Sequence, residues 1–206
     1  GRHPAIKRLA FEELMAHHLS LRQKRSAIKS KPAKTIRADS PLQRGFLDAL
    51  PFRLTQAQRT VTAEIQRDMQ TGHPMLRLVQ GDVGSGKTVV AAMAALSVIA
   101  AGGQAALMAP TELLAEQHAA TFAAWFGPLG IETVFLAGKQ TADMKKKHLA
   151  RIADGPSMII GTHALIQEHV HYQDLRLVMV DEQHRFGVHQ RLSLRDKGDE
   201  GAFSPH

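Results

Sequence analysis

Residues Gly81–Thr88 read Gly-Asp-Val-Gly-Ser-Gly-Lys-Thr and fit the pattern G-x-x-x-x-G-K-[ST] in full. The apolar run Met75–Gln80 precedes them, and an alanine-rich stretch with helical spacing follows. A strand-loop-helix unit of this kind aims backbone N–H groups and the positive end of a helix dipole at one point, where an anion binds. The motif therefore predicts a phosphate-binding loop within an α/β fold.

From Leu54 onward the chain alternates short apolar runs with longer helical stretches. The runs expected to be strands are Met75–Gln80, Gln104–Ala109, Glu132–Ala137, Ser157–Gly161 and Leu175–Val180. Helices are expected at about 55–70, 87–101, 112–125, 141–153 and 163–168. Alternation of this type predicts a mainly parallel sheet with flanking helices.

The positive charge of the chain is concentrated at its N-terminal end. Residues 1–53 hold 12 Lys and Arg against 4 Asp and Glu, whereas residues 54–206 hold 14 against 15. The segment 4–29 has helical spacing, and residues 30–51 look like a connector with one short helix. We therefore expect a basic helical connector at 1–51 and one α/β domain at 52–206. The basic arm would attract a polyanion, or it is a solvated linker, and the sequence leaves both interpretations open.

Composition excludes several other classes of protein. Hydrophobic residues make up 44% and charged residues 22%, as in ordinary globular domains. No apolar run reaches the roughly 18 residues of a membrane span, so no membrane partner is expected. The absence of cysteine excludes disulfides and cysteine-based zinc sites, and the histidines show no zinc-like pairing.

The phosphate-binding loop predicts an ATP–Mg²⁺ site. Lys87 would reach the β- and γ-phosphates, and the Thr88 hydroxyl would ligate Mg²⁺. Asp181 and Glu182 directly follow an apolar run, which places carboxylates at the ligand-binding edge of a parallel sheet. Asp181 would hold Mg²⁺ and Glu182 would polarise the attacking water. The predicted nucleotide-binding residues are Gly81, Asp82, Val83, Gly84, Ser85, Gly86, Lys87 and Thr88, and the predicted catalytic residues are Glu182, Asp181 and Lys87.

The predicted base-binding residues lie upstream of the loop. The chain has no asparagine, so it cannot carry the N-K-x-D element with which GTPases read guanine. The Gln58 side chain offers a donor and an acceptor that suit the N6/N7 edge of adenine, and Phe52 could stack on the base. The alternative is that Thr55–Gln58 is only a helix start with Thr55 as its N-cap.

Five motifs occur in the order found in superfamily 2 helicases. They are Thr55–Gln58, Gly81–Thr88, Ala109–His118, Gly161–Ala164 and Asp181–His184. With Arg185–Arg191 after the Asp-Glu pair, the chain resembles the RecG-type helicases in particular, from about Phe52 to Gly198. The resemblance implies a RecA-like P-loop NTPase domain that uses ATP and Mg²⁺. It also implies a motor that remodels branched or forked DNA, such as stalled replication forks, in recombination and repair.

The same resemblance assigns roles to the remaining motif residues. It implies DNA contacts, mainly to the phosphate backbone, from Pro110, Thr111, Gly161, Thr162 and His163, and coupling between the two sites by Gln183 and His184. Taken without the family, each of the DNA motifs is a strand-to-helix turn with a threonine N-cap. Few aromatic residues argue against a base-stacking platform.

The resemblance also implies which parts of the machine lie elsewhere. We expect the chain to be the first motor domain with part of its connector, ending before the second motor domain and without the wedge domain. These missing domains of the same parent chain are its expected partners, together with DNA. We expect a monomeric, cytoplasmic bacterial protein associated with the nucleoid, and an isolated chain that is nearly inactive.

Other functions remain open at this point. A transcription-repair coupling translocase has a similar box followed by Arg-Phe-Gly, although Gln183–His184 and Gln190–Arg191 favour the RecG type. A small-molecule or nucleotide kinase would explain the loop but neither the Asp-Glu pair nor the threonine motifs. In isolation the chain could also be a nucleotide-binding module without catalysis.

Overall fold

The computed structural model describes residues 4–37, 40–82, 84–138, 140–182, 188–198 and 203–206. Its centre is a parallel sheet with the strand order β2-β3-β1-β4. The strands are β1 Gln104–Met108, β2 Thr133–Leu136, β3 Met158–Gly161 and β4 Leu175–Val180. The expected α/β class with a mainly parallel sheet is confirmed.

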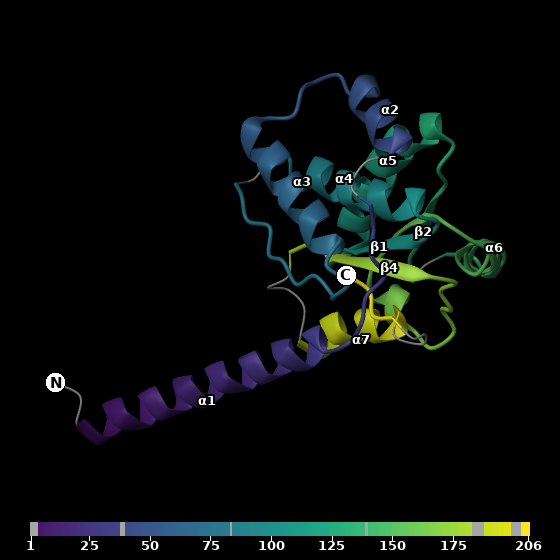
Figure 1. Cartoon of the computed structure of the whole chain (residues 1–206). Helices are drawn as coiled ribbons and strands as arrows, with labels where there is room; N and C mark the ends of the chain where they lie inside the picture. The colour runs from purple at the N-terminus through teal and green to yellow at the C-terminus, as the bar shows by residue number, and fades with distance from the viewer. Residues whose placement is uncertain (1–3, 38–39, 83, 139, 183–187, 199–202) are drawn as a thin grey trace.

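Helices cover both faces of this sheet (Figure 1). They are α1 Pro4–Lys29, α2 Pro41–Ala49, α3 Gln56–Met69, α4 Lys87–Ala100, α5 Glu112–Phe126, α6 Ala142–Ile152 and α7 Val188–Gly198, with short 3-10 turns η1 Gly127–Leu129 and η2 His163–Ile166. Helices α4 and α5 pack on one face with α2 and α3 outside α4, whereas α7 and η2 lie on the other face. None of the described helices combines the length and hydropathy that a membrane crossing requires.

The alternation of side chains along the strands builds two hydrophobic clusters. Ala105 and Leu107 of β1 belong to the cluster under α4 and α5, whereas Ala106 and Met108 belong to the opposite cluster. All five β1 residues are buried, as expected for a strand covered on both faces. The sheet is therefore a rigid frame between two packed layers.

The connector joins the first of these clusters. Ile36 and Phe46 are almost completely buried there, and the Phe46 ring makes edge contacts with Trp125 and Phe126. The buried Gln43 amide donates to the Met93 carbonyl at 2.9 Å. The boundary expected after residue 51 stays a prediction, since residues on its N-terminal side pack into the same core.

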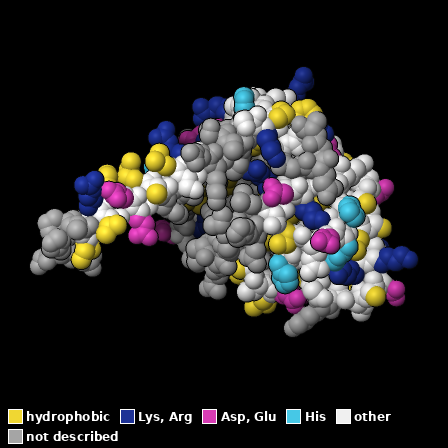
Figure 2. Space-filling view, turned by 90° about the horizontal axis from the view of Figure 1, so that it is seen from below, with side chains coloured by type: hydrophobic (Ala, Val, Ile, Leu, Met, Phe, Trp, Pro, Cys, Tyr) yellow, Lys and Arg dark blue, Asp and Glu magenta, His cyan; other side chains and the backbone are white. Residues whose placement is uncertain are grey.

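Helix α1 extends away from the domain (Figure 1). Apolar and charged side chains are interspersed along this projecting helix (Figure 2). Leu9, Phe11 and Leu14 are each more than half exposed, and Arg8 pairs with Glu12 one helical turn away. Both interpretations of the basic arm remain predictions.

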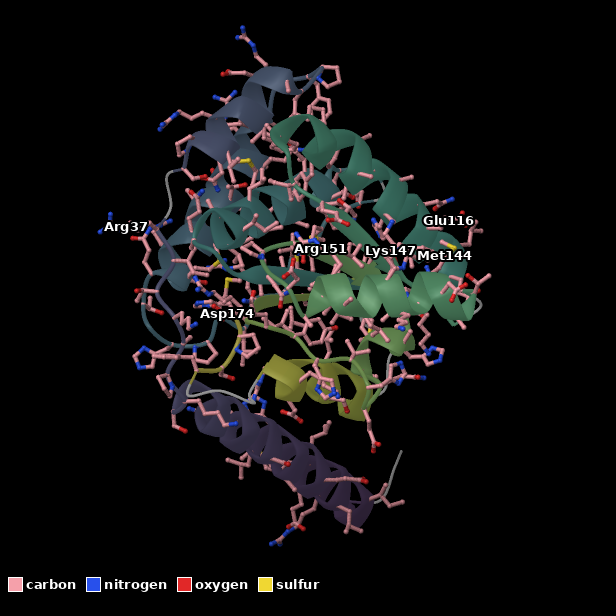
Figure 3. The ribbon with its side chains drawn as sticks, turned by 90° about the vertical axis from the view of Figure 1, so that its right-hand side faces the viewer. Arg37, Glu116, Met144, Lys147, Arg151 and Asp174 are labelled. Carbon is pink, nitrogen blue, oxygen red and sulfur yellow. The ribbon has the colours of Figure 1, made fainter. Side chains whose placement is uncertain are left out.

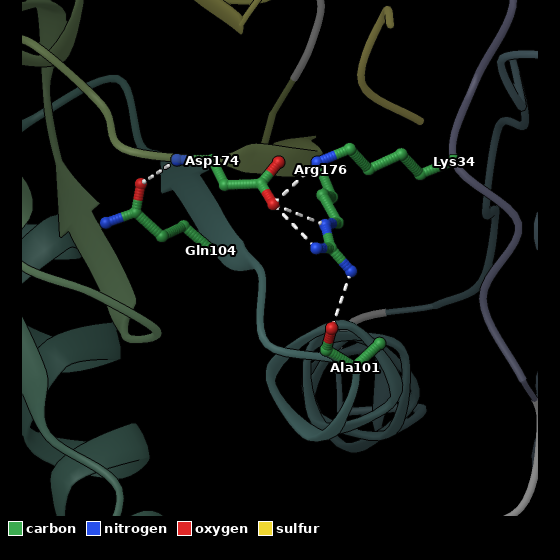
Figure 4. Close-up of polar contacts among 5 residues, drawn as sticks. All are labelled: Lys34, Ala101, Gln104, Asp174 and Arg176. Atoms are coloured by element: carbon green, nitrogen blue, oxygen red, sulfur yellow. Dashed lines mark hydrogen bonds and ion pairs between the residues drawn. The ribbon is translucent and has the colours of Figure 1, made fainter.

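An ion-pair cluster fixes the connector to the amino ends of the strands. Asp174 Oδ2 accepts from Lys34 Nζ at 2.8 Å and from the Arg176 guanidinium at 2.6 and 2.9 Å (Figure 4). Arg176 also donates to the Ala101 carbonyl at the end of α4. Figure 3 shows Asp174 on the side of the molecule opposite Met144, which lies near the start of α6.

Two expected elements differ from the structure. Met75–Gln80 is not a strand, and Leu76 and Leu78 are 46% and 62% exposed. A strand exists only through pairing with a neighbouring strand. The outer edge of β4 is instead hydrogen-bonded to the backbone of His206, through the carbonyl of Arg176 and the N–H of Val178. The helix expected at 163–168 is the 3-10 turn η2, while α7 was not predicted.

Candidate nucleotide and nucleic-acid site

The predicted functional segments emerge at one edge of the sheet. In the β-ladder, Met108 pairs with both Gly161 and Val180, so β1, β3 and β4 end side by side. Ligands of open α/β sheets bind at this carboxyl edge. The segments that leave it are Ala109–Thr111, Thr162–His163 and Asp181–Glu182.

The phosphate-binding loop ends where α4 begins, at Lys87. Gly86 caps this helix with φ of 79°, a left-handed conformation that favours glycine. Lys87 Nζ donates to the carbonyl oxygens of Gly81 and Asp82 at 2.6 and 2.9 Å, so its charge lies within the loop. Gly81, Asp82, Gly84 and Ser85 are exposed, Gly86, Lys87 and Thr88 are half-buried, and Val83 lies outside the described residues. The loop thus offers a helix N-terminus and a lysine to an anion.

Gln58 joins α3 to this loop. Its Oε1 accepts the Thr55 N–H at 2.8 Å while Thr55 Oγ1 accepts the Gln58 N–H, which forms a capping box. Its Nε2 donates to the Ser85 carbonyl at 2.9 Å, and a β-carbon at Gly86 would collide with that amide. The amide oxygen has a second lone pair and the amide nitrogen has a second hydrogen, and a base could use both. Phe52, at 45% exposure, is accessible.

Asp181 follows β4 directly and is half-buried. Its Oδ2 lies 2.8 Å from Nε2 of His118 on α5, and its Oδ1 accepts the Glu182 N–H at 3.0 Å. The His118 hydrogen bond lowers the pKa of Asp181 against the opposing effect of burial, and the charge of Lys87 acts in the same direction as His118. His118 therefore contributes most to keeping Asp181 ionised, and the loop lysine adds a smaller contribution.

Glu182 is the exposed second carboxylate of the pair. Its φ of 50° is unusual for a residue other than glycine. Backbone strain of this kind concentrates at functional sites. Gln183 and His184, the predicted coupling residues, lie outside the described residues, so their roles stay predictions.

The loop and the end of β4 carry oxygen donors of the types that a magnesium ion prefers. Among the described residues, no three or more His, Cys, Asp or Glu side chains are grouped to hold a metal ion. Mg²⁺ is commonly bound through one or two carboxylates together with substrate phosphates and water. The Thr88 hydroxyl and the Asp181 carboxylate match this donor set.

The residues predicted to contact DNA differ in how exposed they are. Thr111 is exposed and caps α5, its Oγ1 accepting the Leu114 N–H at 3.3 Å, so its hydroxyl hydrogen remains able to donate. Pro110 is half-buried and His163 is exposed. By contrast, Thr162 is 3% exposed, and Gly161 is packed so closely on β2 that a β-carbon would collide with the Leu136 carbonyl.

Sequence reasoning gave no role to His118. Its side chain is 18% exposed and shares a face of α5 with the buried Ala115 and Phe122. A histidine in line with buried apolar positions at i−3 and i+4 needs a hydrogen-bond partner. The spacing of His118 from Ala115 and Phe122 could therefore have indicated a partly buried, hydrogen-bonded histidine, but it could not have identified Asp181 as its partner.

Comparison with known proteins adds a family and several relatives. Residues 55–197 match the model of the DEAD/DEAH box helicases. The ATP-dependent DNA helicase RecG of Escherichia coli (strain K12) is 56% identical over the whole chain, and that of Haemophilus influenzae is 53% identical. The chain spans about 30% of the length of each relative.

A solved structure of another protein has a fold similar to that of this chain. The structure of RecG bound to a three-way DNA junction matches 96% of this chain with a TM-score of 0.79 and 36% identity, over 30% of that protein. The resemblance to RecG-type helicases is therefore confirmed, and the transcription-repair coupling alternative is not favoured. The match to a helicase family model favours the helicase interpretation over a kinase.

Proposed function

The chain belongs to the DEAD/DEAH box helicase family, and from this premise we propose that it is the nucleotide-binding motor domain of a RecG-type, ATP-dependent DNA helicase. The observation that supports this most is that Asp181 and Glu182 directly follow β4 at the carboxyl edge of the sheet, and that the charge of Lys87 in the loop helps to lower the pKa of Asp181. The RecG protein whose solved structure resembles the chain is bound to a three-way DNA junction. We accordingly propose branched DNA as the substrate of the whole protein, acting in recombination and repair.

In this proposal the loop holds the phosphates of ATP. Lys87 exchanges the carbonyl oxygens of Gly81 and Asp82 for phosphate oxygens, which form stronger, charge-assisted hydrogen bonds. Thr88 and Asp181 hold Mg²⁺, which neutralises phosphate charge when bound. Glu182 accepts the proton of the attacking water. Gln58 and Phe52 contact the adenine base.

DNA lies along the same edge in this proposal. Thr111 and the N-terminal amides of α5 would hold a phosphate, while His163 is a second exposed donor at the start of η2, just after the neighbouring strand β3. The burial of Gly161 and Thr162 favours a supporting role for these two residues, since they lie beneath the surface. Contacts of this type are independent of sequence and weaken with salt.

The remaining parts of the proposal concern the longer protein. Because the chain spans about 30% of its relatives, a second motor domain and a wedge domain are proposed as its partners within one parent chain. We further propose a monomer in the bacterial cytoplasm. The test is ATP turnover by the chain extended to the length of its relatives, with and without a three-way junction. Stimulation by the junction supports the proposal, and turnover without any response to DNA contradicts it.

A further inference from the structure

His118 and Asp181 form a contact that the proposed chemistry has not used. The imidazole Nε2 lies 2.8 Å from Asp181 Oδ2, and the side chains are 18% and 30% exposed. The two residues are 63 positions apart in the chain and come from different elements, α5 and the end of β4. The contact therefore depends on the tertiary fold and not on local chain geometry.

The position of His118 is fixed by its helix. Ala115 and Phe122 on the same face are fully buried, and α5 packs on β2 and β3. The imidazole has little freedom because its backbone is held by this packing and its ring is largely enclosed. Its donor is consequently aimed at one place, the end of β4.

The carboxylate of Asp181 is held from two sides. His118 donates to Oδ2 and the backbone N–H of Glu182 donates to Oδ1 at 3.0 Å. One donor on each oxygen fixes the plane of the carboxylate, while each oxygen keeps a second lone pair for a metal ion or its water. A carboxylate held by one donor alone could rotate about its side-chain bonds.

We propose that His118 is a positioning residue that orients the Asp181 carboxylate toward the magnesium–nucleotide complex. The inference rests on the proposed function, because it assigns Asp181 to the metal. It depends on the N–H at Nε2 and not on the charge of the ring, because neutral and protonated imidazole can both carry that hydrogen. Hydrogen-bonding partners of metal ligands usually change metal affinity by about 10–100-fold when removed.

The test is a Mg²⁺ titration of nucleotide binding to the 206-residue chain. A fluorescent ATP analogue reports binding, and the quantity measured is the Mg²⁺ concentration at half-saturation. His118→Leu keeps the bulk but removes the donor, and His118→Gln keeps a donor near the place of Nε2. We expect His118→Leu to raise the half-saturating Mg²⁺ concentration about tenfold or more, and His118→Gln to restore most of the loss.

A matched control separates positioning from packing. His148 on α6 is also half-buried, and its ring contacts Gln140 instead of Asp181, so His148→Leu should leave the Mg²⁺ requirement unchanged. Binding of the analogue without Mg²⁺ should be equal in all variants. Asp181→Asn, which removes a charge from the metal ligand itself, sets the scale of the largest effect.

Three results would overturn the inference. They are a wild-type Mg²⁺ requirement in His118→Leu, an equal defect in His118→Gln, or the same loss of affinity without Mg²⁺, which would mean that the histidine only supports the fold. A wild-type chain that bound the analogue without any response to Mg²⁺ would instead contradict the proposed function.

Discussion

The side-chain amide of Gln58 donates to the backbone carbonyl of Ser85 at 2.9 Å, so the residue expected to recognise adenine also touches the phosphate-binding loop. The same amide accepts the Thr55 N–H and closes the capping box of α3. A base bound at Gln58 would therefore be connected to the loop through one side chain. If Gln58 recognises adenine as proposed, this geometry links base recognition to phosphate binding.

Gln58→Ala should reduce the preference for ATP over GTP by about tenfold, since two neutral hydrogen bonds contribute about 0.5–1.5 kcal/mol each. Competition titrations with the two nucleotides measure this ratio. Thr55→Ala is the control, because it removes the N-cap of α3 and leaves the Gln58 amide in place. An equal loss of preference in Thr55→Ala would assign the effect to the helix cap.

Thr111→Ala should weaken DNA binding about 3–10-fold for every sequence tested, through loss of one hydroxyl donor to a phosphate. The salt dependence should stay nearly constant, because a neutral hydroxyl releases no counterion. Ser40→Ala removes an equivalent N-cap from α2, which packs on α4 and η1. If Ser40→Ala weakened DNA binding as much, the Thr111 effect would reflect stability alone.

The Asp174 cluster predicts a pH-dependent stability. Burial alone would raise the pKa of Asp174, but the hydrogen bonds and charges of Arg176 and Lys34 outweigh it and lower the pKa below the usual 3.8. A depressed pKa in the folded state stabilises the fold above the unfolded value, and this stabilisation disappears as pH falls through the folded value.

Asp174→Asn should therefore lower the melting temperature by roughly 2–4 °C at pH 7, the shift expected for about 1 kcal/mol. The difference from wild type should shrink below pH 3.8. Asp154→Asn is the control, since that carboxylate is 82% exposed and 4.0 Å from Arg151. A difference that persisted undiminished at low pH would rule out the ion pairs as its cause.

Glu182→Gln should preserve nucleotide binding and slow hydrolysis about 10²–10⁴-fold, because an amide cannot accept the proton of the attacking water. The rate is measured on the chain extended to the length of its relatives. Near-normal turnover in this variant would place the general base elsewhere.

Local sequence predicted most of the fold because the sheet is buried on both faces. The apolar runs that became β1 to β4 are short, and their burial requires helices between them. The run Met75–Gln80 is also apolar at alternate positions, yet it lacks a partner strand over the described residues. Composition predicts an extended backbone, but pairing depends on which neighbour lies beside it.

The sequence predicted those parts of the candidate site that lie within a short motif. The loop around Lys87 and the pair at Asp181 each follow from a short motif and its position after an apolar run. The His118–Asp181 contact joins residues 63 positions apart and needs the packing of α5 on the sheet. The burial of Thr162 likewise depends on neighbouring elements, so a motif alone could not separate it from the exposed Thr111.

Calorimetric titration of the 206-residue chain with ATP, in the presence and absence of Mg²⁺, tests the central claim most directly when wild type and Lys87→Ala are compared. The variant loses a charge-assisted hydrogen bond to phosphate, worth about 1.5–3 kcal/mol, so its affinity should fall roughly 10–100-fold. The account predicts Mg²⁺-dependent binding by the wild-type chain and this loss in the variant. Equal affinity of the two proteins for ATP would contradict a nucleotide site at Gly81–Thr88.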